Sequence, residues 1–137
     1  MAQADIPTLV GTFVTLYNNT YDTNRGEIFK FYHPQAMLTF ESENHVGAEA
    51  IQGKLGSLPF QEIRHDKPTV RVQPSVTDGF VLVMITGHFT ASGLDKPFAY
   101  SQAFQLKVPD IIDPNLPPEE NAAKFQICND FFLLSFG

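Results

Sequence analysis

Cysteine and tryptophan are nearly missing from this chain, and their scarcity excludes some common ways of stabilising a small fold. Among 137 residues there is no tryptophan and a single cysteine, Cys128. One thiol cannot close an internal disulfide, and the neighbours Phe125 and Ile127 are typical of a small buried residue in a reducing compartment. We therefore expect a structural role for Cys128 and a single domain, residues 1–137, that is held together by an apolar core.

Basic charge is also scarce. Nine Lys and Arg stand against 15 Asp and Glu, which gives a formal net charge of −6. The basic residues are scattered singly between Arg25 and Lys124, whereas binding to a phosphate backbone requires them in clusters. The composition argues against a nucleic-acid partner, and an acidic surface is suited to steering a basic protein partner.

Long apolar runs are absent as well. No stretch is long enough to span a bilayer, and the first residues, Met-Ala-Gln-Ala-Asp-Ile-Pro, lack the basic flank and apolar run of a signal peptide. We expect no membrane insertion, and the cytosol and the nucleus both remain open as locations.

Motifs for metal, phosphate or nucleophile chemistry are missing too. The sequence has no His-x-x-x-His pair, no Cys pair, no Gly-rich phosphate loop and no Gly-x-Ser-x-Gly turn. We predict neither a metal nor a cofactor. His65 is the best candidate for a base, since it follows an apolar Leu-Pro-Phe step, although a lone histidine is usually structural or solvated. In an apolar pocket Tyr32, Tyr100 and His65 would suit proton transfer next to a carbonyl, or a dehydration.

Apolar residues at helical spacing predict helices in the first half of the chain. Residues 7–21 form an amphipathic pattern, a shorter helix is predicted at 25–32 and ends at His33-Pro34, and a third is predicted at 48–58. The residues expected to face inward from the second helix are Ile28, Phe29 and Tyr32.

Strand patterns fill most of the remaining chain. They cover 37–42, the alternation around Val70 and Val72, and the segments 80–91, 98–108 and 124–135. Helices followed by consecutive strands indicate an α+β fold with a curved antiparallel sheet and helices on one face.

Two local features qualify this picture. Gly87 lies inside a strand pattern and suggests a bulge or bend that would curl the sheet around a cavity. Residues 109–120, PDIIDPNLPPEE, hold four prolines and four acidic residues, which predicts an extended, acidic, proline-rich hairpin loop at the surface.

Phe40-Glu41 at the end of the first strand pattern is the most suggestive pair. Alternation along a strand places a large ring on one face and a carboxylate on the other. This arrangement suits a partner that offers a phenylalanine beside a lysine or arginine, and it also suits a core Phe40 next to a solvated Glu41, which the sequence alone favours.

Two short strings, Met-Leu-Thr-Phe-Glu at 37–41 and Ser-Leu-Pro-Phe-Gln at 57–61, resemble the nuclear transport factor 2 family. These proteins are small carriers that take the GDP-bound GTPase Ran into the nucleus. The likeness extends over nearly the whole chain, through Phe13, Tyr17, the turn at 22–25, residues 81–87, Ser101-Gln102 and Asn129-Asp130. It implies the cone-shaped family fold, in which a strongly bent antiparallel sheet and three N-terminal helices enclose an apolar cavity. It also implies a face-to-face sheet homodimer.

The resemblance assigns roles to particular positions. Family members take an aromatic side chain of Ran into the cavity and hold basic residues at its rim. Phe40 then corresponds to the aromatic at the mouth, Glu41 to the rim acid and His65 to a residue near the cavity. The loop at 91–96 leaves Asp95 as its one carboxylate, where relatives carry several. Phe131 falls at the family's dimer face.

The resemblance also implies nucleoporin binding. Some relatives grip Phe-x-Phe-Gly repeats with a tryptophan, which this chain lacks, so Ile6 and Leu9 are the candidate groove residues. The resemblance as a whole implies a non-enzymatic carrier of Ran-GDP that is found in the cytoplasm, the nucleus and the nuclear pore. The alternatives are a scaffold subunit of a messenger-RNA export factor or RNA-granule protein, and a small isomerase or dehydratase of the same fold.

Overall fold

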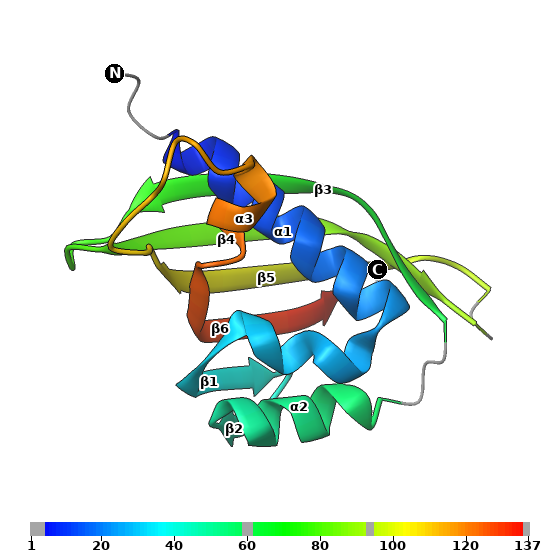
Figure 1. Cartoon of the computed structure of the whole chain (residues 1–137). Coiled ribbons are helices and arrows are strands. Elements are labelled where there is room, and N and C mark those ends of the chain that lie inside the picture. Colours follow the sequence, from blue (N-terminus) through cyan, green and yellow to red (C-terminus); the bar gives the residue numbers. More distant parts are fainter. Residues whose placement is uncertain (1–4, 59–61, 93–94, 136–137) are drawn as a thin grey trace.

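The computed structural model describes residues 5–58, 62–92 and 95–135. Its elements along the chain are α1 (Ile6–Thr23), the 3-10 helix η1 (Arg25–Phe31), β1 (Tyr32–Phe40), β2 (Glu43–Val46), α2 (Ala48–Gly56), β3 (Ile63–Pro74), β4 (Phe80–Ala91), β5 (Phe98–Lys107), α3 (Pro118–Ala122) and β6 (Gln126–Ser135). Figure 1 shows α1 running across one face of a curved sheet, with α3 against α1 and α2 beside β1. The predicted α+β class is confirmed. None of the described helices is both long and apolar enough to cross a membrane.

The sheet has the strand order β2-β1-β6-β5-β4-β3 and is open, because β2 and β3 lie at opposite edges. β3, β4, β5 and β6 pair antiparallel in succession, as predicted. β1 pairs with β6 in parallel, so the prediction of an entirely antiparallel sheet is wrong for this pair. A short turn forces its two strands to be antiparallel, whereas β1 and β6 are separated by most of the chain and are free of that constraint.

Helix α1 confirms the predicted helix at 7–21. Asp5 caps its first turn, where the carboxylate accepts hydrogen bonds from the backbone N–H of Thr8 at 3.3 Å and from its hydroxyl at 2.6 Å. The inner side of the helix buries Phe13 and Tyr17 against the sheet, and the Phe13 ring meets Phe104 edge-on at 6.4 Å between centroids. This apolar stripe is what fixes the helix on the concave face of the sheet.

The second predicted helix is a 3-10 helix, and one of its inward assignments is wrong. Ile28 and Tyr32 are buried, but Phe29 is 43% exposed. With about three residues per turn, a 3-10 helix places Phe31 rather than Phe29 on the side of Ile28. Phe31 accordingly packs edge-on against Phe13, with 5.5 Å between the ring centroids.

Strand β1 starts earlier than predicted and continues through His33-Pro34, which was expected only to stop the helix. Proline is tolerated here because the register between β1 and β6 is irregular from Tyr32 to Met37. β2 was not predicted at all, since none of its residues is buried and it has no apolar alternation. α2 ends at Gly56, and Pro59 of the Leu-Pro-Phe step lies outside the described residues.

Gly87 marks a bulge, but the extra residue is on the neighbouring strand. Asp66 pairs with His88 and Thr69 with Thr86, so two residues of β3 face Gly87 alone. A Cβ atom at position 87 would lie 3.3 Å from the Cα of Pro68 and 3.3 Å from the Tyr100 hydroxyl. Glycine is therefore needed for this close approach of three strands.

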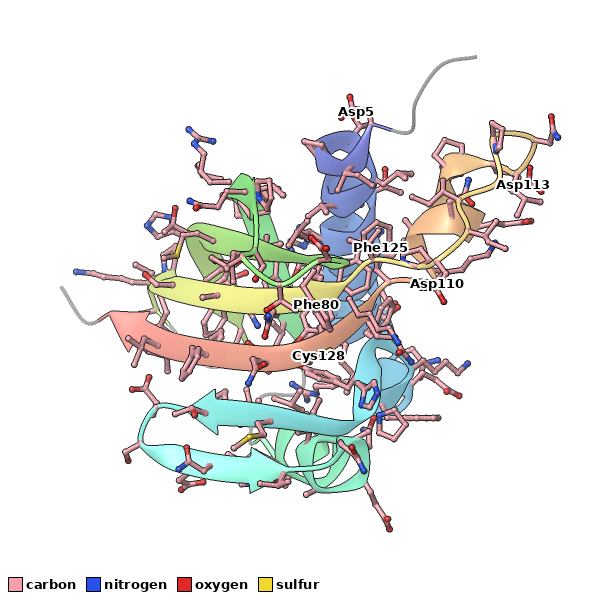
Figure 2. The ribbon with its side chains drawn as sticks, turned by 90° about the vertical axis from the view of Figure 1, so that its left-hand side faces the viewer. Asp5, Phe80, Asp110, Asp113, Phe125 and Cys128 are labelled. Carbon is pink, nitrogen blue, oxygen red and sulfur yellow. The ribbon has the colours of Figure 1, made fainter. Side chains whose placement is uncertain are left out.

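The acidic, proline-rich segment is less extended than predicted, because its end forms α3. Asn121 is 4% exposed and anchors the loop. Its Nδ2 donates to the carbonyl of Asp113 at 2.8 Å, and its Oδ1 accepts from the N–H of Asp113 at 3.1 Å. Figure 2 shows Asp113 on the loop beside α3. The reciprocal pair satisfies backbone groups that a free loop would leave to water.

Candidate functional site

A small apolar cavity lies between the end of α1, the region after α2 and the inner face of the sheet. The described residues that line it are Tyr21, Phe40, Leu58, Ile63, His65, Phe89, Phe132 and Leu134. Its free volume is about 10 Å³, roughly the space that one water molecule occupies by this measure. Two of the predicted site residues, Phe40 and His65, therefore meet at one cavity that their own neighbours nearly fill.

Phe40 lies in a stack of aromatic rings. Its ring is parallel to that of Phe132, with 4.9 Å between centroids and 8° between planes. Phe132 stacks in turn on Tyr100 at 5.6 Å and 15°. The ammonium group of Lys54 lies 5.2 Å from the centroid of the Phe40 ring. Phe40 is half-buried whereas Phe132 is buried, so Phe40 is the outer ring of the stack.

Glu41 follows Phe40 in an unusual backbone conformation. Its φ is +58°, the one positive φ at a non-glycine residue among those that the structure describes. Its N–H donates to the carbonyl of Phe132 at 2.9 Å, and its Oε1 accepts from the N–H of Leu134 at 2.6 Å. A left-handed conformation costs about 1–2 kcal/mol for such a residue, and these two bonds to β6 hold it in place. Among the described residues, the second carboxylate oxygen of Glu41 has no hydrogen-bond partner.

His65 is fixed by Asp22, a residue that sequence analysis did not connect with it. Its Nδ1 lies 2.7 Å from Oδ1 of Asp22, and its backbone N–H donates to Oδ2 at 2.9 Å. Tyr21 and Tyr100 meet the imidazole edge-on, at 5.1 and 5.6 Å between centroids. Because His65 and Asp22 are 43 positions apart in the chain, no local sequence pattern could have paired them.

The three groups proposed for acid-base chemistry do not converge. Tyr100 contacts His65 through its ring, but its hydroxyl is directed at Gly87 and has no hydrogen-bond partner among the described residues. Burial, and then the negative charge of Asp22, raises the pKa of Tyr100 to about 12. Tyr32 belongs to a different cluster, in which its hydroxyl donates to Asp130 at 2.7 Å.

This second cluster is buried in the core and was also missed. Asp130 is 2% exposed and accepts from Tyr32 and, at 3.1 Å, from Nε2 of Gln102, while the hydroxyl of Tyr17 lies 2.7 Å from that of Tyr32. Burial raises the pKa of Asp130 to about 7, although both hydrogen bonds act to lower it. The same burial raises the pKa of Tyr17 and of Tyr32 well above the usual tyrosine value.

The remaining predicted site residues lie away from the cavity. Asp95 is exposed in the connection between β4 and β5 and is not among the lining residues. Ile6 is half-buried at the start of α1, whereas Leu9 is 7% exposed and belongs to the core. Of the two predicted groove residues, Ile6 is therefore the more exposed.

Phe131 lies on the opposite, outer face of the sheet. Across neighbouring strands it is in register with Thr39 on one side and with Ala103, Met84 and Arg71 on the other. Exposed apolar side chains of this face include Met37, Leu82, Met84, Phe131 and Leu133, each between 44% and 56% exposed. We call these five residues the outer apolar patch. Patches of this kind mark interaction surfaces.

No metal site is found among the residues that the structure describes. In residues 5–58, 62–92 and 95–135, no three His, Cys, Asp or Glu side chains gather in a way that could hold an ion. Cys128 is half-buried, and its burial raises the pKa of the thiol, as suits a structural cysteine.

An α+β cone, with a helix across the concave face of a curved sheet and an apolar cavity at one end, defines the class of fold. The chain matches the model of the nuclear transport factor 2 domain over residues 9–134. It is 40% identical over 133 residues to nuclear transport factor 2 of Oryza sativa subsp. japonica, covering 97% of this chain and 99% of that protein. The protein of that name from Saccharomyces cerevisiae is 36% identical over 132 residues, 96% of each chain. The chain belongs to the nuclear transport factor 2 domain family.

Solved structures agree with this assignment. The structure of nuclear transport factor 2 from Cryptosporidium parvum has a TM-score of 0.76 and 32% identity, and the match covers 94% of each chain. More distant structures share the fold alone. A hexachlorocyclohexane dehydrochlorinase has a TM-score of 0.70 at 11% identity, covering 95% of this chain and 85% of that one. The C. albicans Mtr2-Mex67 M domain complex has a TM-score of 0.69 at 14% identity, covering 93% and 94%.

Proposed function

We propose that this protein is a nuclear transport carrier that binds GDP-bound Ran at the mouth of the cavity and brings it into the nucleus. The observation that carries the proposal is that Phe40 and His65 line one cavity, in a chain related over nearly its whole length to proteins named nuclear transport factor 2. Glu41 follows Phe40 and is bonded to Leu134, which also lines the cavity. A half-buried ring next to a carboxylate suits an aromatic anchor flanked by basic side chains.

Binding requires the cavity to open. A free volume of about 10 Å³ does not admit an aromatic ring. Phe40 is the less buried member of its stack with Phe132, so we expect its ring to move when a partner's ring enters. The free oxygen of Glu41 and the exposed carboxylate of Asp95 would then receive basic side chains of Ran.

The carrier acts as a homodimer in this proposal. The outer apolar patch runs across the face of the sheet, with Phe131 and Met84 on either side of the small Ala103. Two copies packed face to face would remove this patch from water, which is the main source of stability in such interfaces. Ile6, at the start of α1, would contribute to a groove for nucleoporin Phe-x-Phe-Gly repeats, and the protein would move between cytoplasm and nucleus through the pore.

The proposed role is not enzymatic. His65 and Asp22 form an ionisable pair at the cavity, but both carboxylate oxygens of Asp22 are engaged by His65 itself. The shared fold of the dehydrochlorinase does not supply a site, since one fold hosts many functions.

The decisive experiment is calorimetry with Ran loaded with GDP or GTP. We expect binding of the GDP form only. Glu41→Lys reverses the rim charge and should abolish binding, while Glu41→Gln keeps an oxygen to accept from the N–H of Leu134 and should weaken binding by about three- to tenfold. Both variants should remain dimeric in size-exclusion chromatography. Equal affinity of the wild type and Glu41→Lys would refute the site.

Calorimetry with Ran and capture experiments with other candidate partners together separate the alternatives. A wild-type protein that fails to distinguish the two nucleotide states of Ran would refute the carrier proposal. Capture of a related domain as a heterodimer would favour an export subunit, and capture of short Phe-containing motifs without Ran would favour an RNA-granule scaffold.

A further inference from the structure

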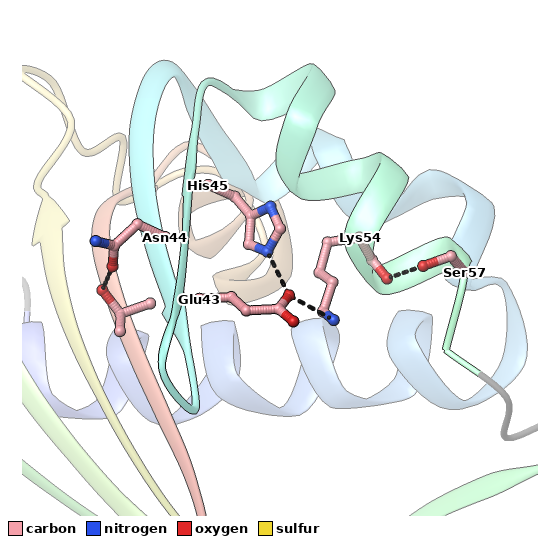
Figure 3. Close-up of polar contacts among 6 residues, drawn as sticks. Glu43, Asn44, His45, Lys54 and Ser57 are labelled. Carbon is pink, nitrogen blue, oxygen red and sulfur yellow. Dashed lines mark hydrogen bonds and ion pairs between the residues drawn. The ribbon is translucent and has the colours of Figure 1, made fainter.

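Lys54 lies beside Phe40, one of the described residues that line the cavity. It lies in the last turn of α2, and its side chain is 21% exposed. Its ammonium group is 2.9 Å from Oε2 of Glu43 and 5.2 Å from the centroid of the Phe40 ring. His45 lies on the other side of the same carboxylate, with its Nε2 3.4 Å away. Figure 3 shows Glu43 directed from the β1–β2 hairpin toward Lys54 on the helix.

Phe40 is therefore held between two groups of its own chain. The ring of Phe132 is stacked against one face at 4.9 Å, so the ammonium group of Lys54 lies over the other. A cation above an aromatic ring is attracted by the negative charge of the ring face. The face of the Phe40 ring, next to the carboxylate of Glu43, would also attract a basic side chain of a partner.

We propose that Lys54 is a built-in competitor for the partner's basic group, which holds the mouth closed over Phe40 until a cation from the partner displaces it. This inference rests on the proposed function and adds the regulation of its site. In the free protein Lys54 covers Phe40 and neutralises Glu43. In the complex a lysine or arginine of the partner takes over that place as its aromatic side chain enters, and the ammonium of Lys54 moves out into solvent.

The exchange makes recognition selective. A partner that has an aromatic side chain but no flanking cation must displace Lys54 without replacing the cation contact that Lys54 made. A partner that offers both replaces one cation contact with another, and the loss is offset. Such a penalty on incorrect partners is a common source of specificity.

A simple structural role for Lys54 makes a different prediction. If the ion pair with Glu43 only fastened α2 to the hairpin, removal of either residue would have the same effect. If Lys54 competes with the partner, the two removals have opposite effects, because Lys54→Met makes the mouth more negative by one charge and Glu43→Gln makes it more positive by one. The sign of the change therefore separates the two roles.

The test is calorimetric titration of the dimeric protein with Ran-GDP at low salt. We expect Lys54→Met to bind about two- to fivefold more tightly and Glu43→Gln to bind about two- to fivefold more weakly, the range typical of partly exposed charge pairs. Lys54→Arg keeps the cation and should bind Ran-GDP with an affinity close to that of the wild type. High salt should reduce both changes, since the charges are screened.

The outcomes distinguish the two proposals. If the affinity for Ran-GDP changed in the same direction in Lys54→Met and Glu43→Gln, or changed in neither, the competitor proposal would be overturned. The proposal of Ran binding would be unaffected. If the wild type itself did not bind Ran-GDP, the proposed function would fail and the competitor with it. In NMR spectra, the ring current of Phe40 should shift the Lys54 ε-methylene signal upfield in the free protein, and Ran-GDP should remove that shift. A signal that Ran-GDP leaves unchanged would also overturn the proposal.

Discussion

Asp130 offers the sharpest test of the buried polar cluster. Its carboxylate is enclosed by the core and accepts from the Tyr32 hydroxyl at 2.7 Å and from Gln102 at 3.1 Å. Burial raises the pKa of Asp130 from 3.8 to about 7. Asp130→Asn keeps the shape and one acceptor oxygen but removes the proton equilibrium, and the Gln102 amide can turn over to accept from the new NH₂ group. The variant therefore isolates the effect of ionisation on stability.

The direction and the size of the change in stability with pH follow from proton linkage. Between its unfolded pKa of about 3.9 and its folded pKa of about 7, Asp130 holds a proton in the folded state that it lacks in the unfolded state. Its contribution to stability is complete below the lower pKa and is lost as pH rises toward the upper one. The slope is about 1.4 kcal/mol per pH unit, so the loss between pH 5 and pH 7 is about 2 kcal/mol.

The assay is urea unfolding of wild type and variant at several pH values, at one protein concentration so that dimerisation contributes equally. The free energy of unfolding of the wild type should fall by about 2 kcal/mol relative to Asp130→Asn from pH 5 to pH 7. In thermal melts this corresponds to roughly 5–10 °C. Asp78→Asn, at an exposed turn, should follow the wild type. If the free energies of unfolding of the wild type and of Asp130→Asn changed in parallel with pH, the conclusion that burial keeps the Asp130 carboxyl protonated would be refuted.

Other predictions address the dimer, the bulge and the loop. Phe131→Glu should be a monomer in analytical ultracentrifugation, with a dimer dissociation constant at least about a hundredfold larger, because an unpaired carboxylate is costly to bury. The control Val76→Glu, in the β3–β4 turn, should remain dimeric. Gly87→Ala should lower the free energy of unfolding by about 1–3 kcal/mol through the crowding of β3 and Tyr100, while Gly53→Ala, with open space on α2, should raise it by about 0.5–1 kcal/mol. Equal effects of the two alanines would contradict the packing described at the bulge. Asn121→Ala should cost about 1–3 kcal/mol in chemical unfolding, because both backbone groups of Asp113 lose their partner, and an unchanged midpoint would contradict that anchor.

The parts of the fold that sequence predicted are those fixed by local patterns. Helix α1 and strands β4 and β5 follow from the spacing of their own apolar residues, and their observed bounds are close to the predicted ones. The errors have local causes as well. Phe29 was misplaced because a 3-10 helix changes the period, and β2 was missed because an exposed edge strand has no apolar alternation.

The candidate site depended on information that the sequence does not hold locally. Phe40, Glu41 and His65 were identified by resemblance, and the structure places Phe40 and His65 at one cavity. The groups that control them were not found. Asp22 is 43 positions from His65 in the chain, and Lys54 meets Phe40 only because α2 folds back over the hairpin. Contacts of this kind arise from tertiary packing and leave no pattern along the sequence.

The position of β6 has a consequence for how the protein is made. β6 is the last strand along the described chain, yet it lies inside the sheet between β1 and β5. While a ribosome is still synthesising residues 126–135, both neighbours present an open edge, and the first half of the protein has no sheet to join. Open edges invite pairing with other chains, and contacts between distant segments form slowly. The nascent chain is therefore most exposed to aggregation just before its final strand emerges, when a chaperone would have the greatest effect on yield.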